Sequence, residues 1–224
     1  MHQINIIDIQ LLNHNVYEIT CTKPVDFFFR AGQAVSMIIG DYLQEAVGRP
    51  FTVTSLPTDS FLQFVIKVYP ERNGFTEKIP NLKNGDILYV SEPWGQITYQ
   101  GPGIFLAAGT GITPFWTIFK KVNKEKGALQ GHKLFFANST KKDIFLEKEL
   151  RKLFEKNSKD IFFLLDKDKK KGYLHDKINL NLIKKYFTDQ RQKIYICGPE
   201  MMVTGLTESL LNHGILDKNI VTEK

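Results

Sequence analysis

The chain has 224 residues, of which 42% are hydrophobic, and this is enough apolar material for one large domain or two modest ones. No apolar run approaches the roughly 20 residues that cross a bilayer, and residues 1–10 lack the basic start and apolar core of a secretory leader. We therefore expect a soluble, cytoplasmic protein with no membrane insertion.

The cysteines and histidines give no sign of a metal centre or a disulfide framework. Cys21 and Cys197 lie far apart without CxxC spacing, so any iron–sulfur centre is expected on a partner protein. The histidines follow no metal-ligand spacing, and each is interpreted as a surface residue. They are His2, His14, His132, His175 and His213. We assign no metal.

The net charge of +6 is divided unevenly between the two halves. Residues 1–100 hold 7 Lys and Arg against 10 Asp and Glu, whereas residues 101–224 hold 23 against 14. A positive C-terminal half suits a nucleotide phosphate or an acidic protein partner, although a lysine-rich solvated surface explains it equally well. The lysines are not interleaved with exposed aromatics and no reading motif is present, so we expect no nucleic-acid partner.

The first hundred residues alternate short β-type runs with turn residues. Regular short strands between turns predict a small antiparallel β-barrel or sandwich, here with one short helix at 75–79. The predicted strands are residues 4–11, 16–21, 34–39, 51–55, 61–69 and 87–91.

From Gly103 onward, continuous apolar runs alternate with amphipathic segments of helix length. This pattern predicts a doubly wound α/β domain, whose parallel sheet binds ligands at the carboxyl ends of its strands. The predicted strands are residues 104–108, 133–137, 161–165, 193–197 and 219–222, and the predicted helices are 114–126, 146–156, 178–187 and 199–213. The Gly101-Pro102-Gly103 hinge divides the chain into expected domains of 1–100 and 101–224.

A glycine-rich turn, Gly109-Thr110-Gly111-Ile112-Thr113-Pro114, joins the first strand of the second domain to its first helix. Glycines let a phosphate approach the backbone, and a helix N-terminus presents unpaired N–H groups to an anion. A pyrophosphate site fits this turn, although tight turns without a ligand also need glycine.

Two further segments have a functional and an ordinary interpretation. Arg49-Pro50-Phe51-Thr52 combines a cation, an aromatic ring and a hydroxyl at a strand start, but an edge strand with a solvated arginine looks the same. Cys197-Gly198-Pro199 ends a strand and leaves its backbone open at the expected crevice. Cys197 is equally compatible with a small buried core residue.

In this order, the three segments resemble the ferredoxin-NADP reductase superfamily, and most closely its short bacterial FAD-binding oxidoreductases. The resemblance covers essentially the whole chain. It implies a flavin-binding barrel, in which Arg49 neutralises the flavin phosphate, Phe51 packs against the isoalloxazine ring and Thr52 hydrogen-bonds near N5. The other flavin-binding residues that it implies are Pro50, Lys67, Tyr69, Gly74, Phe75 and Thr76.

The same resemblance implies a nicotinamide-nucleotide site on the second domain. Its catalytic residues are Cys197 and Glu223, together with Thr52 of the barrel. The implied cofactor-binding residues here are Gly109, Thr110, Gly111, Thr113, Ser139, Lys141, Cys197, Gly198 and Pro199. Lys141 and Lys142 in the ribose region favour NADPH slightly over NADH, though lysine is a less telling phosphate ligand than arginine.

The function implied by this resemblance is hydride transfer from NADPH or NADH to FAD, with FMN left open, followed by electron transfer to an acidic carrier such as ferredoxin or flavodoxin. One alternative is a reductase of free flavin, ferric chelates or a quinone. Another is a non-catalytic electron-transfer subunit of a complex, although the C-terminal cysteine cluster of such subunits is missing from this sequence.

Overall fold

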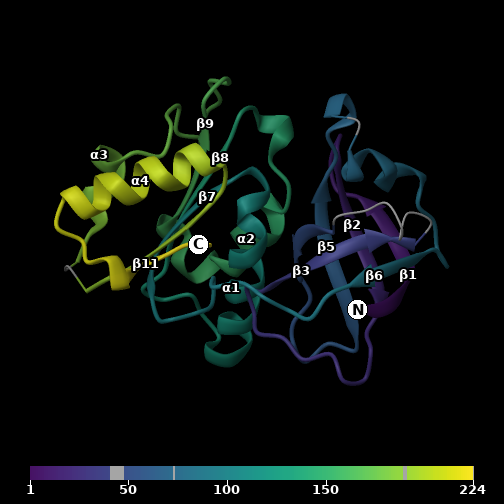
Figure 1. The fold of residues 1–224 in the computed structure, drawn as a ribbon. Helices are drawn as coiled ribbons and strands as arrows, with labels where there is room; N and C mark the ends of the chain where they lie inside the picture. The colour runs from purple at the N-terminus through teal and green to yellow at the C-terminus, as the bar shows by residue number, and fades with distance from the viewer. Residues whose placement is uncertain (41–47, 73, 189–190, 224) are drawn as a thin grey trace.

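The computed structural model describes residues 1–40, 48–72, 74–188 and 191–223. They form two lobes, an N-terminal β-barrel and a C-terminal α/β sheet, with helix α1 (Ile112–Lys126) at the junction between them (Figure 1). Among these described residues, no helix combines the length and the apolar character needed to cross a bilayer.

The barrel has six antiparallel strands in the order β4-β3-β6-β1-β2-β5. They are β1 (His2–Leu11), β2 (Val16–Thr22), β3 (Ala34–Ile39), β4 (Arg49–Thr52), β5 (Phe61–Lys67) and β6 (Ile87–Val90). The strand predicted at 51–55 already ends at Thr52, because the backbone N–H of Val53 bonds Gln33 while that of Thr54 bonds Gln63. The chain thus crosses from β3 to β5 and nearly closes the barrel.

The second sheet is parallel, in the order β11-β10-β7-β8-β9, and confirms the predicted doubly wound fold. Its strands are β7 (Gly103–Ala108), β8 (Lys133–Asn138), β9 (Ile161–Leu165), β10 (Lys193–Cys197) and β11 (Ile220–Val221). The chain runs from β7 outward to β9 and then returns to the other side of β7. The strand order therefore reverses between β7 and β10, and ligands bind at such a switch point.

Helices cover both faces of this sheet. On one face, α1 and α2 (Glu147–Leu153) pack on Phe105, Phe136 and Phe163. On the other, α3 (Leu180–Ile183) and α4 (Glu200–Asn212) pack on the opposite side chains of the same strands, such as Phe135. Residues buried on both faces explain the continuous apolar runs in the sequence.

Two predicted helices are shorter than expected. The one predicted at 146–156 is α2 followed by a 3-10 segment, Glu155–Asp160, and the one predicted at 178–187 is α3 followed by the 3-10 turn Lys184–Tyr186. Tyr186 turns from the helix to pack on Phe135 and Phe162, with ring centroids 5.3 and 5.1 Å apart. Tertiary packing overrides helical periodicity there. The short helix predicted at 75–79 is also a 3-10 segment, Phe75–Asn81.

The surface interpretation of His132 is wrong, because its side chain is only 1% exposed. Its ring stacks on that of Tyr99, in the interdomain linker between β6 and β7, with the ring centroids 5.6 Å apart. It also stacks on Phe105 of β7, with the ring centroids 5.8 Å apart. Its Nδ1 donates to the Gln130 carbonyl, which can only accept, and its Nε2 lies 3.0 Å from the Tyr99 hydroxyl. A neutral ring satisfies both contacts without burying a charge.

Candidate functional site

A crevice of about 1010 Å³ lies between the barrel and the carboxyl ends of the sheet strands. Ligand pockets usually measure roughly 300–1,000 Å³, so this crevice is large enough for an extended ligand. Most of the residues singled out in the sequence line it. They are Pro50, Phe51, Thr52, Lys67, Tyr69, Thr76, Gly109, Thr110, Gly111, Thr113, Ser139, Cys197, Gly198 and Pro199.

The barrel wall of the crevice is built around Phe51 and Thr52 on β4. Phe51 is half-buried and packs on Phe75, with ring centroids 5.3 Å apart and the rings inclined by 39°. The hydroxyl of Thr52 lies 3.1 Å from that of Thr113, which belongs to the glycine-rich turn of the other domain. The two sequence motifs are therefore in direct contact.

The sheet wall is formed where β7 and β10 end. A Cβ atom added to Gly111 would lie 2.2 Å from the carbonyl oxygen of Cys197, a backbone atom that cannot step aside. Gly109 has a φ of +52°, in the left-handed region that favours glycine. Glycine is thus required at Gly111 by the close approach of two strand ends, which brings the two predicted nucleotide motifs together, and it is favoured at Gly109 by the backbone conformation alone.

A row of polar contacts along α1 fixes the two walls relative to each other. Thr113, Thr117, Lys120 and Lys124 lie three or four residues apart and so share one face of the helix. Each contacts the last residue of β4 or the chain just after it, and we call this row the helix edge. Its further contacts run from Thr117 Oγ1 to the Val53 carbonyl (2.9 Å), from Lys120 Nζ to the Thr54 carbonyl (2.5 Å) and from Lys124 Nζ to Thr58 Oγ1 (3.1 Å).

The charge of Lys120 is partly desolvated in this row. Burial lowers the pKa of its ammonium, and the nearby carboxylates of Asp59 and Glu18 offset that effect only in part. The sequence analysis missed the helix edge, although the spacing of two threonines and two lysines on one helix face was visible in it.

Some predicted residues do not line the crevice. Arg49 is exposed on β4, and neither it nor Gly74 nor Phe75 is among the lining residues, although the neighbouring Thr76 is. Glu223 accepts hydrogen bonds from the backbone N–H groups of Gln96 (3.1 Å) and Ile97 (3.0 Å). It therefore ties the end of the chain to the linker.

Cys197 does line the crevice, at the end of β10. Burial, with a smaller contribution from the charge of Glu223, raises the pKa of its thiol to about 12. The thiol is therefore protonated at neutral pH and is not a nucleophilic thiolate.

Lys141 is engaged outside the crevice. Its ammonium pairs with Glu147 and lies 4.8 Å from the ring centre of Tyr173. Burial acts to lower the pKa of Lys141, but hydrogen bonds to Glu147 and Tyr173 outweigh it and raise the pKa. This lysine is held by its own domain.

Several lining residues were missed in the sequence, among them Asn138, Asp143, Asp166 and Asp176. Asn138 is 9% exposed, and its Nδ2 has no hydrogen-bond partner among the described residues. A buried amide donor without a partner is costly, so a ligand oxygen in the crevice would satisfy it. Its signal was a polar residue at the carboxyl end of an apolar parallel strand.

The residues present fit a flavin and a dinucleotide. The crevice offers an aromatic and hydroxyl wall, a glycine-rich turn that opens the 15-residue helix α1, and a donor that lacks a partner. These are the features that a planar ring system, a pyrophosphate and a ribose require.

The chain also matches known proteins in both halves. A family model described as an FAD-binding domain matches residues 1–91, and one described as an oxidoreductase NAD-binding domain matches residues 105–208. NADH-cytochrome b5 reductase 1 of Dictyostelium discoideum is 28% identical over 230 residues, which cover 95% of this chain and 78% of that protein.

Solved structures share the two-domain fold. The FAD/NAD-binding domain of nitric oxide dioxygenase from Vibrio cholerae O1 biovar El Tor has a TM-score of 0.84 and 16% identity, covering 99% of this chain and 97% of that one. A ferredoxin NADP+ reductase from Neisseria gonorrhoeae has a TM-score of 0.82 and 16% identity, with the same coverage. With both family models matched in order, the chain belongs to the ferredoxin-NADP reductase superfamily and is an NAD(P)H-dependent flavin oxidoreductase with FAD as its cofactor.

Proposed function

We propose that this protein takes hydride from NADH in the crevice and delivers single electrons to a haem carrier of the cytochrome b5 type. The observation that carries the proposal is the contact between the hydroxyls of Thr52 and Thr113, because it joins the barrel motif to the nucleotide turn. Bound FAD supplies an acceptor that takes two electrons as hydride and releases them one at a time.

We assign flavin binding to residues 1–100 and dinucleotide binding to residues 101–224. On the barrel, Phe51 supports the ring system from its contact with Phe75, and Pro50 and Tyr69 complete the wall. Arg49 faces solvent next to this wall, where it neutralises the flavin phosphate together with the N–H groups and hydroxyl of the Gly74–Thr76 turn.

Thr52 has a specific role in this assignment. Thr113 Oγ1 lies 2.9 Å from the Thr110 carbonyl, which only accepts, so the single hydroxyl proton of Thr113 points there. The Thr52 hydroxyl then donates to Thr113 Oγ1, and its two oxygen lone pairs remain to accept hydrogen bonds from a ligand in the crevice, which Thr52 lines. Thr52 can therefore accept a hydrogen bond from the flavin N5 atom once that nitrogen carries a proton.

The dinucleotide is assigned to the switch point between β7 and β10. Its pyrophosphate lies on the backbone of Gly109, Thr110 and Gly111, where the first turn of α1 leaves N–H groups unpaired. Cys197 and Gly198 offer a small neutral surface for the nicotinamide, since the thiol keeps its proton. Ser139 and Asn138 face the ribose end of the crevice.

The charges at that end favour NADH over NADPH. Asp166 and Asp176 line the crevice, and a 2′-phosphate would add a further charge of about −2 beside them. Lys141, which the sequence analysis had assigned to this region, is occupied by Glu147. The relatives that the chain matches over most of its length are named NADH-cytochrome b5 reductases, which points to the same nucleotide.

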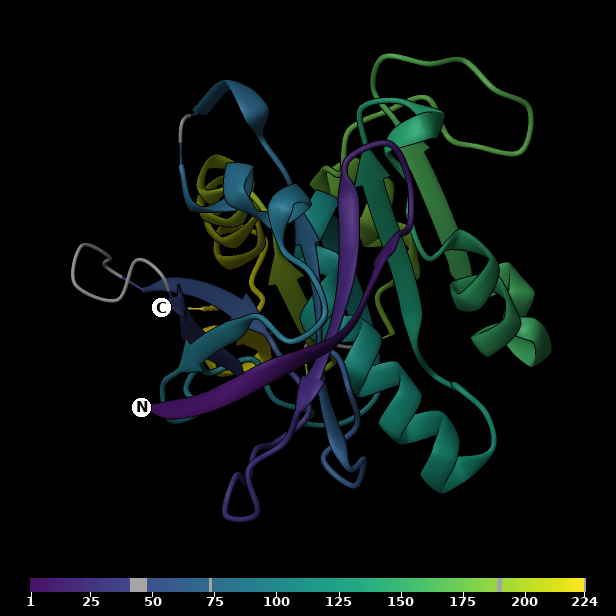
Figure 2. The same ribbon diagram turned by 90° about the vertical axis from the view of Figure 1, so that its right-hand side faces the viewer.

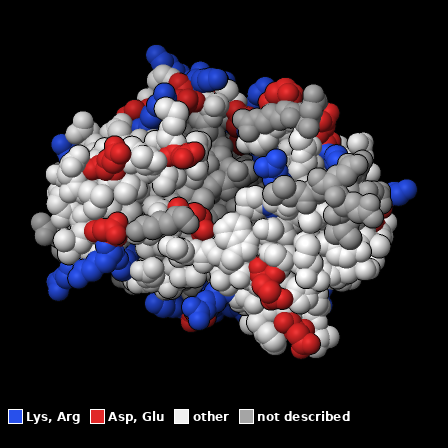
Figure 3. Space-filling view, viewed as in Figure 1, with Lys and Arg blue, Asp and Glu red and all other residues white. Residues whose placement is uncertain are grey.

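The acceptor is proposed on the same likeness rather than on surface charge. On the face shown in Figure 3, basic side chains lie mainly around the rim and acidic ones are scattered across it. That distribution does not indicate an acidic carrier. We therefore rank ferredoxin and flavodoxin below cytochrome b5 as proposed acceptors, on the names of the relatives alone.

The test is a steady-state comparison of acceptors and nucleotides with the FAD-loaded protein. We expect kcat/KM for cytochrome b5 to exceed that for ferredoxin, flavodoxin, free flavin and ferric chelates, and NADH to exceed NADPH by at least about tenfold. Asp166→Asn should narrow the nucleotide preference, because it removes one repelling charge. Equal rates with a small ferric chelate and with every carrier would contradict the proposed acceptor.

A further inference from the structure

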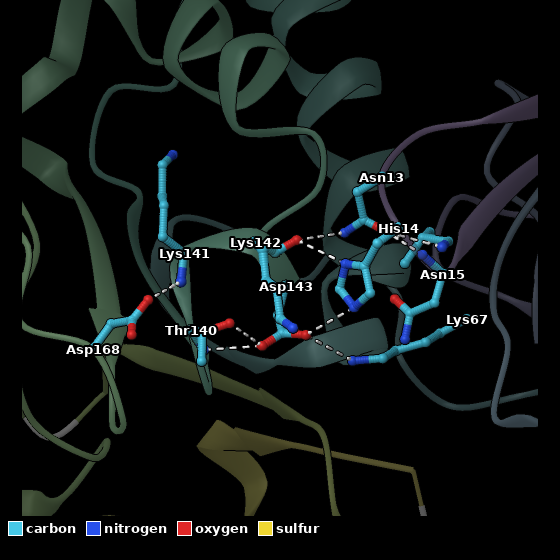
Figure 4. A network of polar contacts seen from close by, with 10 residues as sticks. Asn13, His14, Asn15, Lys67, Thr140, Lys141, Lys142, Asp143 and Asp168 are labelled. Atoms are coloured by element: carbon cyan, nitrogen blue, oxygen red, sulfur yellow. Dashed lines mark hydrogen bonds and ion pairs between the residues drawn. The ribbon is translucent and has the colours of Figure 1, made fainter. Parts of the chain in front are cut away.

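The carboxylate of Asp143 uses its two oxygens for different domains (Figure 4). Its Oδ2 accepts hydrogen bonds from the backbone N–H of Thr140 (3.0 Å) and from the Thr140 hydroxyl (2.6 Å), within its own turn. Its Oδ1 faces the barrel, 3.5 Å from Nε2 of His14 and 3.7 Å from Nζ of Lys67. One oxygen anchors the side chain and the other is presented across the domain interface.

The turn that carries Asp143 is fixed from within the sheet domain. The backbone N–H of Lys141 donates to Asp168 (2.9 Å), and Thr140 and Asp143 form a reciprocal capping box. These hydrogen bonds therefore hold the Asp143 carboxylate at a defined position in the sheet domain.

The barrel grips the same turn through the connection between β1 and β2. Asn13 Nδ2 donates to the Lys142 carbonyl (3.1 Å), and His14 Nδ1 donates to it as well (3.2 Å). Figure 2 shows this connection, in purple, beside the green segment after β8. We call Asn13, His14 and Lys67 of the barrel, with Lys142 and Asp143 of the sheet domain, the latch.

Lys67 is the member of the latch that reaches both Asp143 and the dinucleotide crevice from the barrel. It ends β5, its side chain is 18% exposed, and both it and Asp143 line the crevice. A lysine ammonium on a four-carbon stem loses considerable rotamer entropy when it binds a phosphate. A carboxylate that already holds the ammonium removes part of that cost before the ligand arrives.

Asp143 stays ionised while it does this. Burial acts to raise the pKa of its carboxyl group, but the hydrogen bonds from Thr140 and the charges of Lys67 and His14 outweigh burial and lower the pKa. The carboxylate is therefore available as a fixed negative charge at neutral pH.

We propose that Asp143 is a positioning residue for dinucleotide binding, which holds the Lys67 ammonium at the crevice wall where it meets the pyrophosphate. This inference rests on the proposed seat of the dinucleotide in the crevice. The sign of the effect is diagnostic, because a carboxylate that acted alone would repel the pyrophosphate and its removal would tighten binding.

The experiment compares Asp143→Asn, Lys67→Gln and the double variant as FAD-loaded proteins, with ferricyanide as a saturating electron acceptor. Asparagine keeps an oxygen for Thr140 and removes the charge. We expect Asp143→Asn to raise the KM for NADH, and the Kd for NAD+ measured at equilibrium, by about five- to tenfold with kcat within twofold. Lys67→Gln should raise both constants at least as far, and the double variant should match Lys67→Gln.

Two controls keep the test decisive. His14→Ala breaks contacts to the same turn without touching the crevice, so we expect a change in KM below about twofold. Thr140→Val removes one of the two hydrogen bonds to Oδ2 and should raise KM in the same direction by a smaller factor, which preserves the test if Asp143→Asn folds poorly. An unchanged or lowered KM in Asp143→Asn, additive effects in the double variant, or an equal rise in His14→Ala would each overturn the inference.

The failure of this inference is distinguishable from failure of the proposed function. If NADH does not bleach the flavin of the wild-type protein, the dinucleotide site itself is wrong. If NADH bleaches the wild-type flavin and Asp143→Asn behaves like the wild type, only the positioning role is lost.

Discussion

The two domains meet along two edges that differ in kind. The helix edge is made of directional hydrogen bonds, and its Thr117 is fully buried, 2.9 Å from the Val53 carbonyl. The latch is looser, because Oδ1 of Asp143 lies 3.5 Å from Nε2 of His14 and 3.7 Å from the Lys67 ammonium, and the His14 side chain is 40% exposed. One edge therefore fixes geometry and the other leaves room for adjustment.

The energies expected for these contacts support the same division. A buried hydrogen bond contributes roughly 0.5–1.5 kcal/mol and leaving its acceptor unpaired costs about 1–3 kcal/mol, whereas exposed ion pairs contribute about 0–1 kcal/mol. In the proposed function, the helix edge runs beside Thr52, next to the flavin position that receives hydride, and the latch runs beside the dinucleotide phosphates. The more rigid helix edge is thus next to the proposed site of hydride transfer. The more adjustable latch is next to the proposed dinucleotide site.

A substitution at Gly111, two residues before the helix edge begins at Thr113, should have the largest effect. In Gly111→Ala the new Cβ would lie 2.2 Å from the Cys197 carbonyl oxygen, so the ends of β7 and β10 must separate. We expect a loss of about 1–3 kcal/mol in the free energy of unfolding and a fall of at least about 100-fold in kcat/KM for NADH.

Gly205→Ala on α4 is the matched control for this substitution, because no atom lies within 4 Å of the added Cβ. It should be neutral or stabilise the helix by up to about 1 kcal/mol. Similar activity losses in both alanine variants would show that the strand contact is not the cause.

Removing the hydroxyl at the domain contact should have the next largest effect. We expect Thr52→Val to slow flavin reduction in anaerobic stopped-flow by about tenfold or more, since a hydrogen bond to the reacting group is lost. FAD content should be retained. Thr58→Val, at the exposed end of the same edge, should reduce at the wild-type rate.

The stability of the two edges can be compared directly by Thr117→Val and His14→Ala. Thr117→Val leaves the buried Val53 carbonyl without its donor and should lower the unfolding free energy by about 1–3 kcal/mol. His14→Ala removes exposed contacts and should cost less than about 1 kcal/mol. Chemical denaturation of both variants measures this difference, and an equal cost would remove the distinction between the edges.

The buried His132, which stacks on Tyr99 of the linker, should contribute a smaller, pH-dependent effect. Burial lowers the pKa of His132 below its usual value. As the pH falls, the unfolded chain therefore binds a proton at this histidine before the folded chain does. Stability should be complete above about pH 6.5 and fall as the pH drops below it, by at most about 1.4 kcal/mol per pH unit. His132→Gln should flatten this slope, and an unchanged slope would assign the pH dependence to other groups.

Local patterns sufficed for the fold and for the crevice motifs. Strand periodicity located the strands of both sheets, and Gly109-Thr110-Gly111 with Cys197-Gly198 marked the switch point, because these signals are short-range. The helix edge pairs residues about 60 positions apart, and the latch pairs residues about 75 to 130 positions apart. Nothing in the local sequence specifies such pairings, so the role of Asp143 was not found.

The same limit explains why the burial of His132 and the partners of Lys141 were not foreseen. His132 is polar and was placed at the surface, yet aromatic neighbours from the linker and β7 enclose it. Lys141 looked like a phosphate ligand, but Glu147 and Tyr173 of its own domain already engage it.

The central claim is that a flavin on the barrel accepts hydride from a dinucleotide on the sheet. The most direct test is an anaerobic titration of the FAD-loaded protein with NADH, in which the flavin absorbance is measured. We expect one equivalent of NADH to bleach the bound flavin completely, and Thr52→Val to bleach to the same end point more slowly. A protein that retains FAD but stays yellow with excess NADH would contradict the claim.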